Sequence, residues 1–269
     1  MSVLLQISDP HFGTEQAPVV AALEALAAQQ QPDLLVLSGD ITQRARPVQF
    51  RAARALMDRL GAPLLAIPGN HDIPLFNLWA RLRHPYVQHC AAFGPELEPV
   101  FRSPDLLVIG VNTTRAHRHE DGEVSAAQVD RVAGLLATAT AAQLRVVVVH
   151  QPIAVVRASD ERNRLHGWAA AQQAWARCGA DVVMGGHIHL PYVAELPGLA
   201  RPMWVVQAGT ALSSRVRSGV PNSVNLLRWP AEGGSCQVEQ WDFAAAEGAF
   251  VCVCVTSIQP ARESLVDGI

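Results

Sequence analysis

The sequence predicts an α/β fold in which a largely parallel sheet carries helices on its faces. Three observations indicate it: short apolar runs recur along the chain, segments of helical periodicity separate several of them, and most runs lack polar alternation. Strands buried on both faces have this uniform apolar character, and strands that alternate with helices are typical of such a sheet. A chain of 269 residues is long enough for one sizeable domain or two small ones.

Each apolar run is predicted as a strand because it is too short for an ordinary helix and is bounded by turn residues. In chain order the predicted strands are 3–7, 34–37, 64–67, 106–109, 146–149, 182–184 and 204–206. Residues 226–229 and 238–243 follow as a hairpin around the glycine turn at 232–234. A last strand is expected at 250–255, within a C-terminal extension at 244–269 whose partner the sequence leaves open.

Four helices are predicted between these strands, at 18–30, 47–60, 125–141 and 167–178. Pro18 suits a first helical turn, and Gly61 follows the expected end of the second helix. Ser125 is a plausible N-cap with Gln128 at capping-box distance. Residues 73–99 interrupt the rhythm and are expected to form a small helical insertion, while 157–166 is expected to be a polar loop.

Composition excludes several classes of protein. Charged residues are 17% of the chain, hydrophobic residues 49% and the net charge is −3, which argues against a disordered chain and against stable nucleic-acid binding. No apolar stretch approaches the ~18–20 residues of a membrane span, so we expect a cytoplasmic protein. Cys252 and Cys254 alternate with valine, which favours one face of a strand over a metal pair.

Polar residues directly after the strands carry the chemistry. Five strand ends in succession deliver residue types that bind metals, namely Asp9 and His11, Asp40, Asn70, His150, and His187 with His189. A single such residue beside a glycine is commonly a turn or core residue, but independent turns would not all select ligand types. The carboxyl ends of the strands in an α/β sheet form its ligand-binding edge, and carboxylates that converge there need a compensating charge.

In the series Asp9-x-His11, Gly39-Asp40, Gly69-Asn70-His71-Asp72, His150 and Gly186-His187-x-His189, the chain resembles the calcineurin-like metallophosphoesterase family. The resemblance covers roughly residues 3–243, so we treat 1–243 as the metallophosphoesterase domain. It implies a four-layer αββα sandwich of two mixed β-sheets flanked by helices. It also implies phosphoester hydrolysis at a dinuclear metal centre, in which a hydroxide held between two cations attacks phosphorus.

The resemblance also implies which residues bind each cation. Asp9, His11, Asp40 and His189 would bind one, and Asp40, Asn70, His150 and His187 would bind the other, with Asp40 as the bridge. Mixed oxygen and nitrogen ligands favour Mn, Fe, Zn or Co over Ca.

By the same analogy, His71 would stabilise the transition state or protonate the leaving oxygen. Asp72 would orient His71, with a helix N-cap as an equally good interpretation. Substrate contacts are hypothesised for Asn112, His117, Arg44 and Thr210, although ordinary loop, helix-start and turn roles explain these residues as well.

The substrate is less well determined than the reaction. The compact length, the Asp9-Pro10-His11 motif and the segment at 186–191 resemble small bacterial cyclic-nucleotide phosphodiesterases. This favours a phosphodiesterase on a small soluble substrate such as 3′,5′-cyclic AMP, in a protein that could be a homo-oligomer. Three alternatives stay open: a pyrophosphohydrolase of a nucleotide-linked lipid precursor, a broad-specificity phosphodiesterase or phosphomonoesterase, and a non-catalytic scaffold of the same fold.

Overall fold

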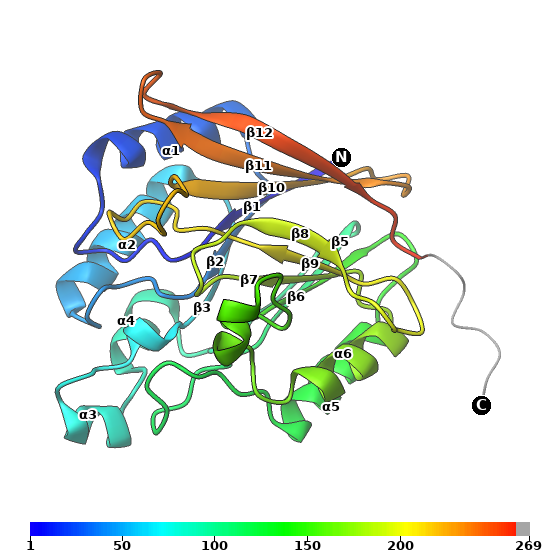
Figure 1. Ribbon diagram of the computed structural model, residues 1–269, viewed down its shortest axis with the longest axis horizontal. Helices are drawn as coiled ribbons and strands as arrows, with labels where there is room; N and C mark the ends of the chain where they lie inside the picture. Colours follow the sequence, from blue (N-terminus) through cyan, green and yellow to red (C-terminus); the bar gives the residue numbers. More distant parts are fainter. Residues whose placement is uncertain (262–269) are drawn as a thin grey trace.

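The computed structural model describes residues 1–261, which form two six-stranded sheets packed face to face (Figure 1). The first sheet has the order β12-β11-β10-β1-β2-β3. Its strands are β1 (Ser2–Ile7), β2 (Leu34–Ser38), β3 (Leu64–Ile67), β10 (Ser223–Trp229), β11 (Cys236–Ala244) and β12 (Ala249–Ile258). Strands β1, β2 and β3 are parallel, whereas β10, β11 and β12 join β1 through antiparallel pairs.

The second sheet has the order β4-β5-β6-β7-β9-β8. Its strands are β4 (Val100–Arg102), β5 (Leu106–Gly110), β6 (Leu144–Val148), β7 (Val182–Gly185), β8 (Tyr192–Glu195) and β9 (Trp204–Gln207). The four central strands are parallel, and the two edge strands are antiparallel to their neighbours. Both sheets are therefore mixed.

Helices cover the outer face of each sheet. Helices α1 (Ala17–Gln30) and α2 (Pro47–Leu60) pack on the first sheet, and α5 (Ala126–Leu136) and α6 (Trp168–Arg177) pack on the second. The predicted αββα sandwich is thus confirmed.

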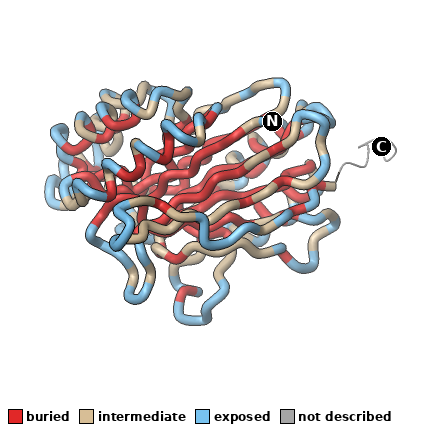
Figure 2. The backbone as a smooth tube through the Cα atoms, turned by 90° about the horizontal axis from the view of Figure 1, so that it is seen from above, coloured by how far each residue is buried: buried red, intermediate tan, exposed pale blue. Residues whose placement is uncertain are grey.

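The apolar runs lack polar alternation because both faces of these strands are buried, one under the helices and the other between the two sheets. Leu5 and Leu35 pack toward α1 and α2, while Leu4 and Leu34 point into the layer between the two sheets, where they join Val146 of the second sheet. Figure 2 shows this buried interior running along the strands, with exposed residues on the helices and loops.

Several element boundaries differ from the prediction. Helix α5 ends at Leu136 instead of 141, and the Thr138 hydroxyl donates to the carbonyl of Leu135 where the chain leaves the helix. The short edge strands β4 and β8 were not predicted. Segment 73–99 contains the two short helices α3 (Leu78–Arg83) and α4 (Val87–Phe93).

The expected C-terminal strand is part of β12, which pairs with β11 at the edge of the first sheet. Cys252 and Cys254 lie on this strand, as the alternation with valine predicted, and both are exposed. The rest of the extension, residues 262–269, lies outside the described residues. Within the part of the chain that the structure describes, no helix combines the length and the apolar character needed to cross a bilayer.

Candidate metal centre

The strand-end residues converge where the carboxyl ends of both sets of parallel strands meet. In the first sheet β1, β2 and β3 are neighbours, so Asp9, Asp40 and Asn70 emerge side by side. In the second sheet β6 and β7 are neighbours, and they deliver His150 and His187. Strand order therefore brings together residues that are far apart in the sequence, beside a cleft of about 500 Å³.

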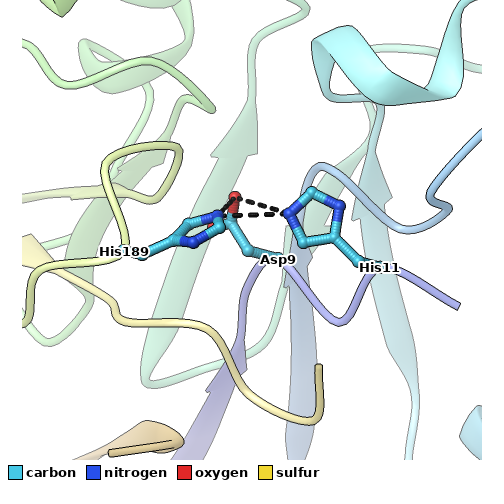
Figure 3. A group of neighbouring side chains, drawn as sticks. All are labelled: Asp9, His11 and His189. Atoms are coloured by element: carbon cyan, nitrogen blue, oxygen red, sulfur yellow. Dashed lines mark hydrogen bonds and ion pairs between the residues drawn. The ribbon is translucent and has the colours of Figure 1, made fainter. Parts of the chain in front are cut away.

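The first group of donor atoms surrounds Asp9. Its Oδ1 atom lies 3.2 Å from Nε2 of His189 and 3.9 Å from Nε2 of His11. The two imidazole Nε2 atoms are 3.1 Å apart, and His11 Nε2 is also 3.8 Å from Oδ2 of Asp40. Figure 3 shows both rings turned toward the Asp9 carboxylate.

The second group shares Asp40 with the first. Oδ1 of Asp40 lies 3.2 Å from Nε2 of His150, which is itself 3.1 Å from Oδ1 of Asn70. Nδ1 of His187 approaches the same Asn70 oxygen at 3.0 Å. The Asp40 carboxylate therefore stands between the two groups, one oxygen toward each.

Backbone carbonyl groups orient two of the imidazole rings. Nδ1 of His150 lies 2.9 Å from the carbonyl oxygen of Ser38, and Nδ1 of His189 lies 2.7 Å from that of Arg215. An outer nitrogen that donates to a carbonyl leaves the inner Nε2 with a free lone pair, which is the form that binds a metal.

Unusual backbone conformations are concentrated at these residues. Among the described residues other than glycine, five of the candidate ligands have positive φ angles, between 42° and 72°: Asp9, His11, Asp40, His187 and His189. Asp and His are enriched in this sparsely populated region, and strain of this kind clusters at functional sites. Glycine is required beside them, because a Cβ atom at Gly69 would collide with the backbone of Asp40, and one at Gly186 with Ser8 and Asp9.

Charge coupling sets the protonation states of the cluster. Burial alone would raise the pKa of Asp9, but His189 and His150 lower it to about 2. The pKa of Asp40 is likewise held well below its usual value, against the effect of burial, by His150 and His71. Both carboxylates are therefore ionised at neutral pH.

The histidines divide into two pairs. Burial lowers the pKa of His11 to about 3 and that of His187 to about 4, so both rings are neutral. For His150 and His189 burial acts in the same direction, but Asp40 raises the pKa of His150 to about 9 and Asp9 raises that of His189. Without another cation nearby, these two rings would supply the positive charge that the carboxylates require.

This donor set fits a pair of divalent cations. Three trios have one donor atom per residue, all within 4.8 Å of one another: Asp9 with His11 and His189, His11 with Asp40 and His71, and Asp40 with His150 and His187. Asp9 and Asp40 are only 0% and 2% exposed, and such buried carboxylates need opposite charge. The trios around Asp9 and around Asp40 correspond to the two ligand sets that the family resemblance implied.

His71 lines the cleft next to Asp40. Its backbone N–H donates to Asp40 Oδ1 at 2.8 Å, and its ring Nδ1 lies 3.1 Å from the carbonyl oxygen of Gln43.

Asp72 joins two loops of the site. Its carboxylate accepts hydrogen bonds from the backbone of Ile41, Thr42 and Gly69 and from the Thr42 hydroxyl, at 2.8–3.0 Å. It therefore fastens the loop after β2 to the loop after β3, beside His71.

The four hypothesised substrate contacts lie in different places. Thr210 is buried and its hydroxyl donates to the carbonyl of Asp9. Asn112 bonds to Thr114 and lines a separate pocket, and His117 is on an exposed loop. Arg44 lines the apolar side of the site, with its guanidinium 5.6 Å from the centre of the Phe76 ring.

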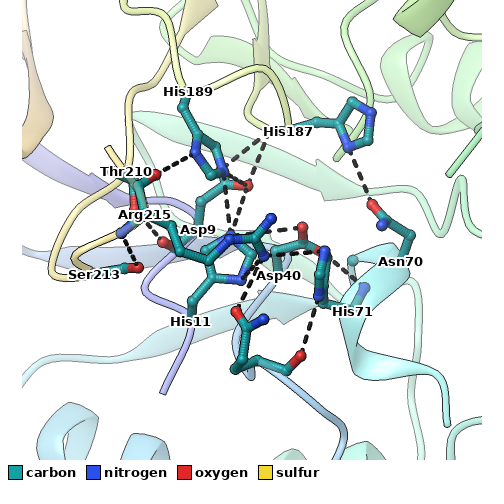
Figure 4. A network of polar contacts seen from close by, with 12 residues as sticks. Asp9, His11, Asp40, Asn70, His71, His187, His189, Thr210, Ser213 and Arg215 are labelled. Carbon is teal, nitrogen blue, oxygen red and sulfur yellow. Dashed lines mark hydrogen bonds and ion pairs between the residues drawn. The ribbon is translucent and has the colours of Figure 1, made fainter. Parts of the chain in front are cut away.

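Arg215 was not singled out by the sequence, yet it reaches the centre of the site (Figure 4). Its Nη1 atom lies 3.1 Å from Nε2 of His71 and 3.5 Å from Nδ1 of His11, and its carbonyl oxygen accepts from His189. Arg217 also lines the cleft, but its guanidinium is paired with Asp160 at 3.1 Å. Arg215 does not follow β9 directly, so the strand-end pattern that identified the other residues did not point to it.

Comparison with known proteins agrees with this geometry. Residues 2–191 match the family model of calcineurin-like phosphoesterases. A cAMP/cGMP dual specificity phosphodiesterase of Mycobacterium tuberculosis is 27% identical over 212 residues, which are 73% of this chain and 64% of that protein. A glycerophosphodiester phosphodiesterase of Enterobacter lignolyticus is 39% identical over 83 residues, 26% of this chain and 29% of that protein. The matched segments thus span less than two thirds of these relatives.

A solved structure extends the agreement to the whole fold. The crystal structure of a dimetal phosphatase from Danio rerio superposes with a TM-score of 0.66 at 12% identity, covering 97% of this chain and 99% of that one. At that level of identity the likeness establishes the architecture.

Proposed function

Because the chain belongs to the calcineurin-like phosphoesterase family, we propose that it hydrolyses phosphodiesters at a centre of two divalent cations. One observation carries the proposal: the buried carboxylate of Asp40 lies between two groups of donor atoms, one centred on Asp9 and the other on Asn70 and His150. We assign Asp9, His11, Asp40 and His189 to one cation and Asp40, Asn70, His150 and His187 to the other. When bound, such cations lower the pKa of water and neutralise charge on phosphate.

The remaining residues act on the substrate. Arg215 places a guanidinium at the mouth of the cleft, where it would donate to a non-bridging phosphate oxygen and hold the phosphorus in position. His71 presents Nε2 toward the same space, where it would deliver a proton to the departing alcohol oxygen. The backbone carbonyl oxygen of Gln43 contacts the other ring nitrogen of His71, Nδ1, and orients the ring.

We further propose a compact substrate of the 3′,5′-cyclic AMP kind. The relatedness to a cAMP/cGMP phosphodiesterase supports this choice. A pyrophosphohydrolase of a nucleotide-linked lipid precursor and a broad-specificity phosphodiesterase or phosphomonoesterase remain the alternatives.

The test uses purified full-length protein whose metal content is measured before and after treatment with a chelator. Manganese, iron, zinc and cobalt are then restored one at a time, and hydrolysis of bis-p-nitrophenyl phosphate, p-nitrophenyl phosphate and 3′,5′-cyclic AMP is measured. We expect chelation to abolish hydrolysis and one or more metals to restore it, with a diester as the best substrate. Monoesters that react faster than every diester would overturn the diester assignment. A protein that binds none of the metals and hydrolyses nothing would be a scaffold of the same fold.

A further inference from the structure

A second pocket lies next to the metal centre, and the hydrolytic step does not use it. It has a volume of about 400 Å³ and lies between the start of α2 and the insertion that carries α3 and α4. Its walls are mainly apolar, and those used below are Arg44, Leu75, Phe76 and Val87.

The pocket lies close to the cleft at the metal centre. Arg44 and Leu75 line both this pocket and a smaller cavity, which in turn shares His71 and Arg215 with that cleft. The apolar pocket and the metal centre are therefore linked by a chain of adjoining cavities.

Large apolar side chains that line this pocket are exposed to solvent. Phe76 is 81% exposed, and Val87 is 49% exposed. A cluster of exposed apolar side chains in a globular protein typically marks a binding surface. The guanidinium of Arg44, 5.6 Å from the centre of the Phe76 ring, adds positive charge on the side that faces the phosphate site.

We propose that this pocket binds an apolar or aromatic group of the substrate, its hydrophobic arm, so that the enzyme selects phosphodiesters that carry a bulky hydrophobic group near the phosphate. The inference rests on the proposed function, because it takes the phosphate to lie at the metal centre. Proximity to that centre favours a substrate arm over a protein partner. A nucleobase and an alkyl chain share the required chemistry.

Inhibition by products of increasing length tests the proposal. Linear monoalkyl phosphates from ethyl to octyl compete with methyl p-nitrophenyl phosphate on manganese-loaded enzyme, and the inhibition constant of each is measured. Because each added methylene group is buried, the inhibition constant should decrease by about three- to fourfold per carbon until the pocket is filled. Phe76→Ala should reduce the decrease to below about twofold per carbon, and the exposed side chain should be removable without loss of the fold.

Leu82→Ala is the matched control, because Leu82 is 68% exposed on α3 and lies outside the pocket lining. It should keep the wild-type dependence on chain length. Equal inhibition by ethyl and octyl phosphate, or the same dependence in the Phe76 and Leu82 variants, would overturn the proposal.

Two further measurements identify the arm and separate the two proposals. If the arm is a nucleobase, Phe76→Ala weakens inhibition by adenosine 5′-monophosphate and leaves inhibition by ribose 5-phosphate unchanged. If the arm is an alkyl chain, Phe76→Ala changes the inhibition by neither compound, and only the dependence on alkyl chain length is lost. Calorimetric titration with the same alkyl phosphates reports binding without catalysis. Binding that strengthens with chain length in a protein that hydrolyses no ester would retain the pocket and refute the proposed function.

Discussion

Nη1 of Arg215 lies 3.1 Å from Nε2 of His71, while the other ring nitrogen of His71 lies 3.1 Å from the carbonyl oxygen of Gln43. A carbonyl oxygen only accepts hydrogen bonds, so Nδ1 of His71 donates to Gln43, and Nε2 is the nitrogen that faces Arg215 and the cleft. Arg215 thus contacts the same nitrogen that would act on the leaving group.

Replacement of Arg215 by glutamine is expected to lower kcat/KM for bis-p-nitrophenyl phosphate by about 10²-fold, because a charged donor to the phosphate is lost. Arg215→Lys should retain part of the activity, since it keeps the charge without the planar fork. Arg217→Gln is the control, because Arg217 is already paired with Asp160. Metal content should be unchanged in all three variants. Equal losses at positions 215 and 217 would exclude a specific role for Arg215.

The variant His71→Ala is expected to keep both metals and to lose turnover by about 10²- to 10⁴-fold, the usual contribution of a general acid. His117→Ala should behave as wild type, because His117 is exposed on a loop. Metal analysis and diester turnover on the same preparations test this expectation. An unchanged rate in the His71 variant would remove this residue from the mechanism.

Gly186→Ala should destabilise the protein, because the added Cβ would collide with the Ser8 hydroxyl and the Asp9 carboxylate. We expect the free energy of unfolding to fall by about 1–3 kcal/mol, the usual cost of overpacking, together with weaker metal binding. Gly134→Ala is the matched control, since Gly134 lies in α5 with open space around its Cβ position. That change should stabilise by about 0.5–1 kcal/mol. Urea unfolding gives both values, and equal stability of the two variants would contradict the packing argument.

His89 on α4 predicts a pH dependence of stability. Its ring is fully buried against Phe93 at a centroid distance of 5.3 Å, and within the described residues neither ring nitrogen has a hydrogen-bond partner. Burial lowers the pKa of His89 from 6.5 to about 4. As the pH falls below 6.5, the unfolded chain binds a proton that the folded protein does not, so stability is lost between pH 6.5 and pH 4.

His89→Leu removes this linkage. At each pH, the free energy of unfolding of wild type is subtracted from that of the variant. This difference should be more positive at pH 5 than at pH 7.5 by about 2 kcal/mol. Urea unfolding at both pH values, with a chelator throughout so that the metal centre contributes equally, measures the difference. The same difference at both pH values would show that His89 does not titrate as inferred.

Local signals account for most of what the sequence predicted. The predicted and observed bounds of α2 coincide at 47 and 60, because Pro47 suits the first turn and Gly61 adopts the left-handed conformation that ends a helix. The candidate ligands were identified by the same kind of signal. Each follows an apolar strand directly, so recognition of the strand locates the residue.

Contacts between distant loops could not be predicted in this way. Arg215 reaches His71 only because β9 lies beside β7 and the two sheets pack face to face, and no feature of the intervening sequence encodes that distance. The hydrogen bonds of Asp72 could not be predicted for the same reason, since its partners Ile41 and Thr42 belong to the loop after β2. The C-terminal strand was recognised, but its place beside β11 depends on the hairpin register.

The position of β1 in the interior of the first sheet has a consequence for biosynthesis. One of its two neighbours is β10, so Leu4 finds its partner Leu227 only after most of the chain has been made. At about 5–20 residues per second, translation leaves this edge of β1 open for roughly 10–45 s. Thr210, which holds the carbonyl of Asp9, is also synthesised late. The last of the candidate ligands, His189, is nevertheless made before β10, so the whole ligand set is present in the chain while this edge of β1 is still open.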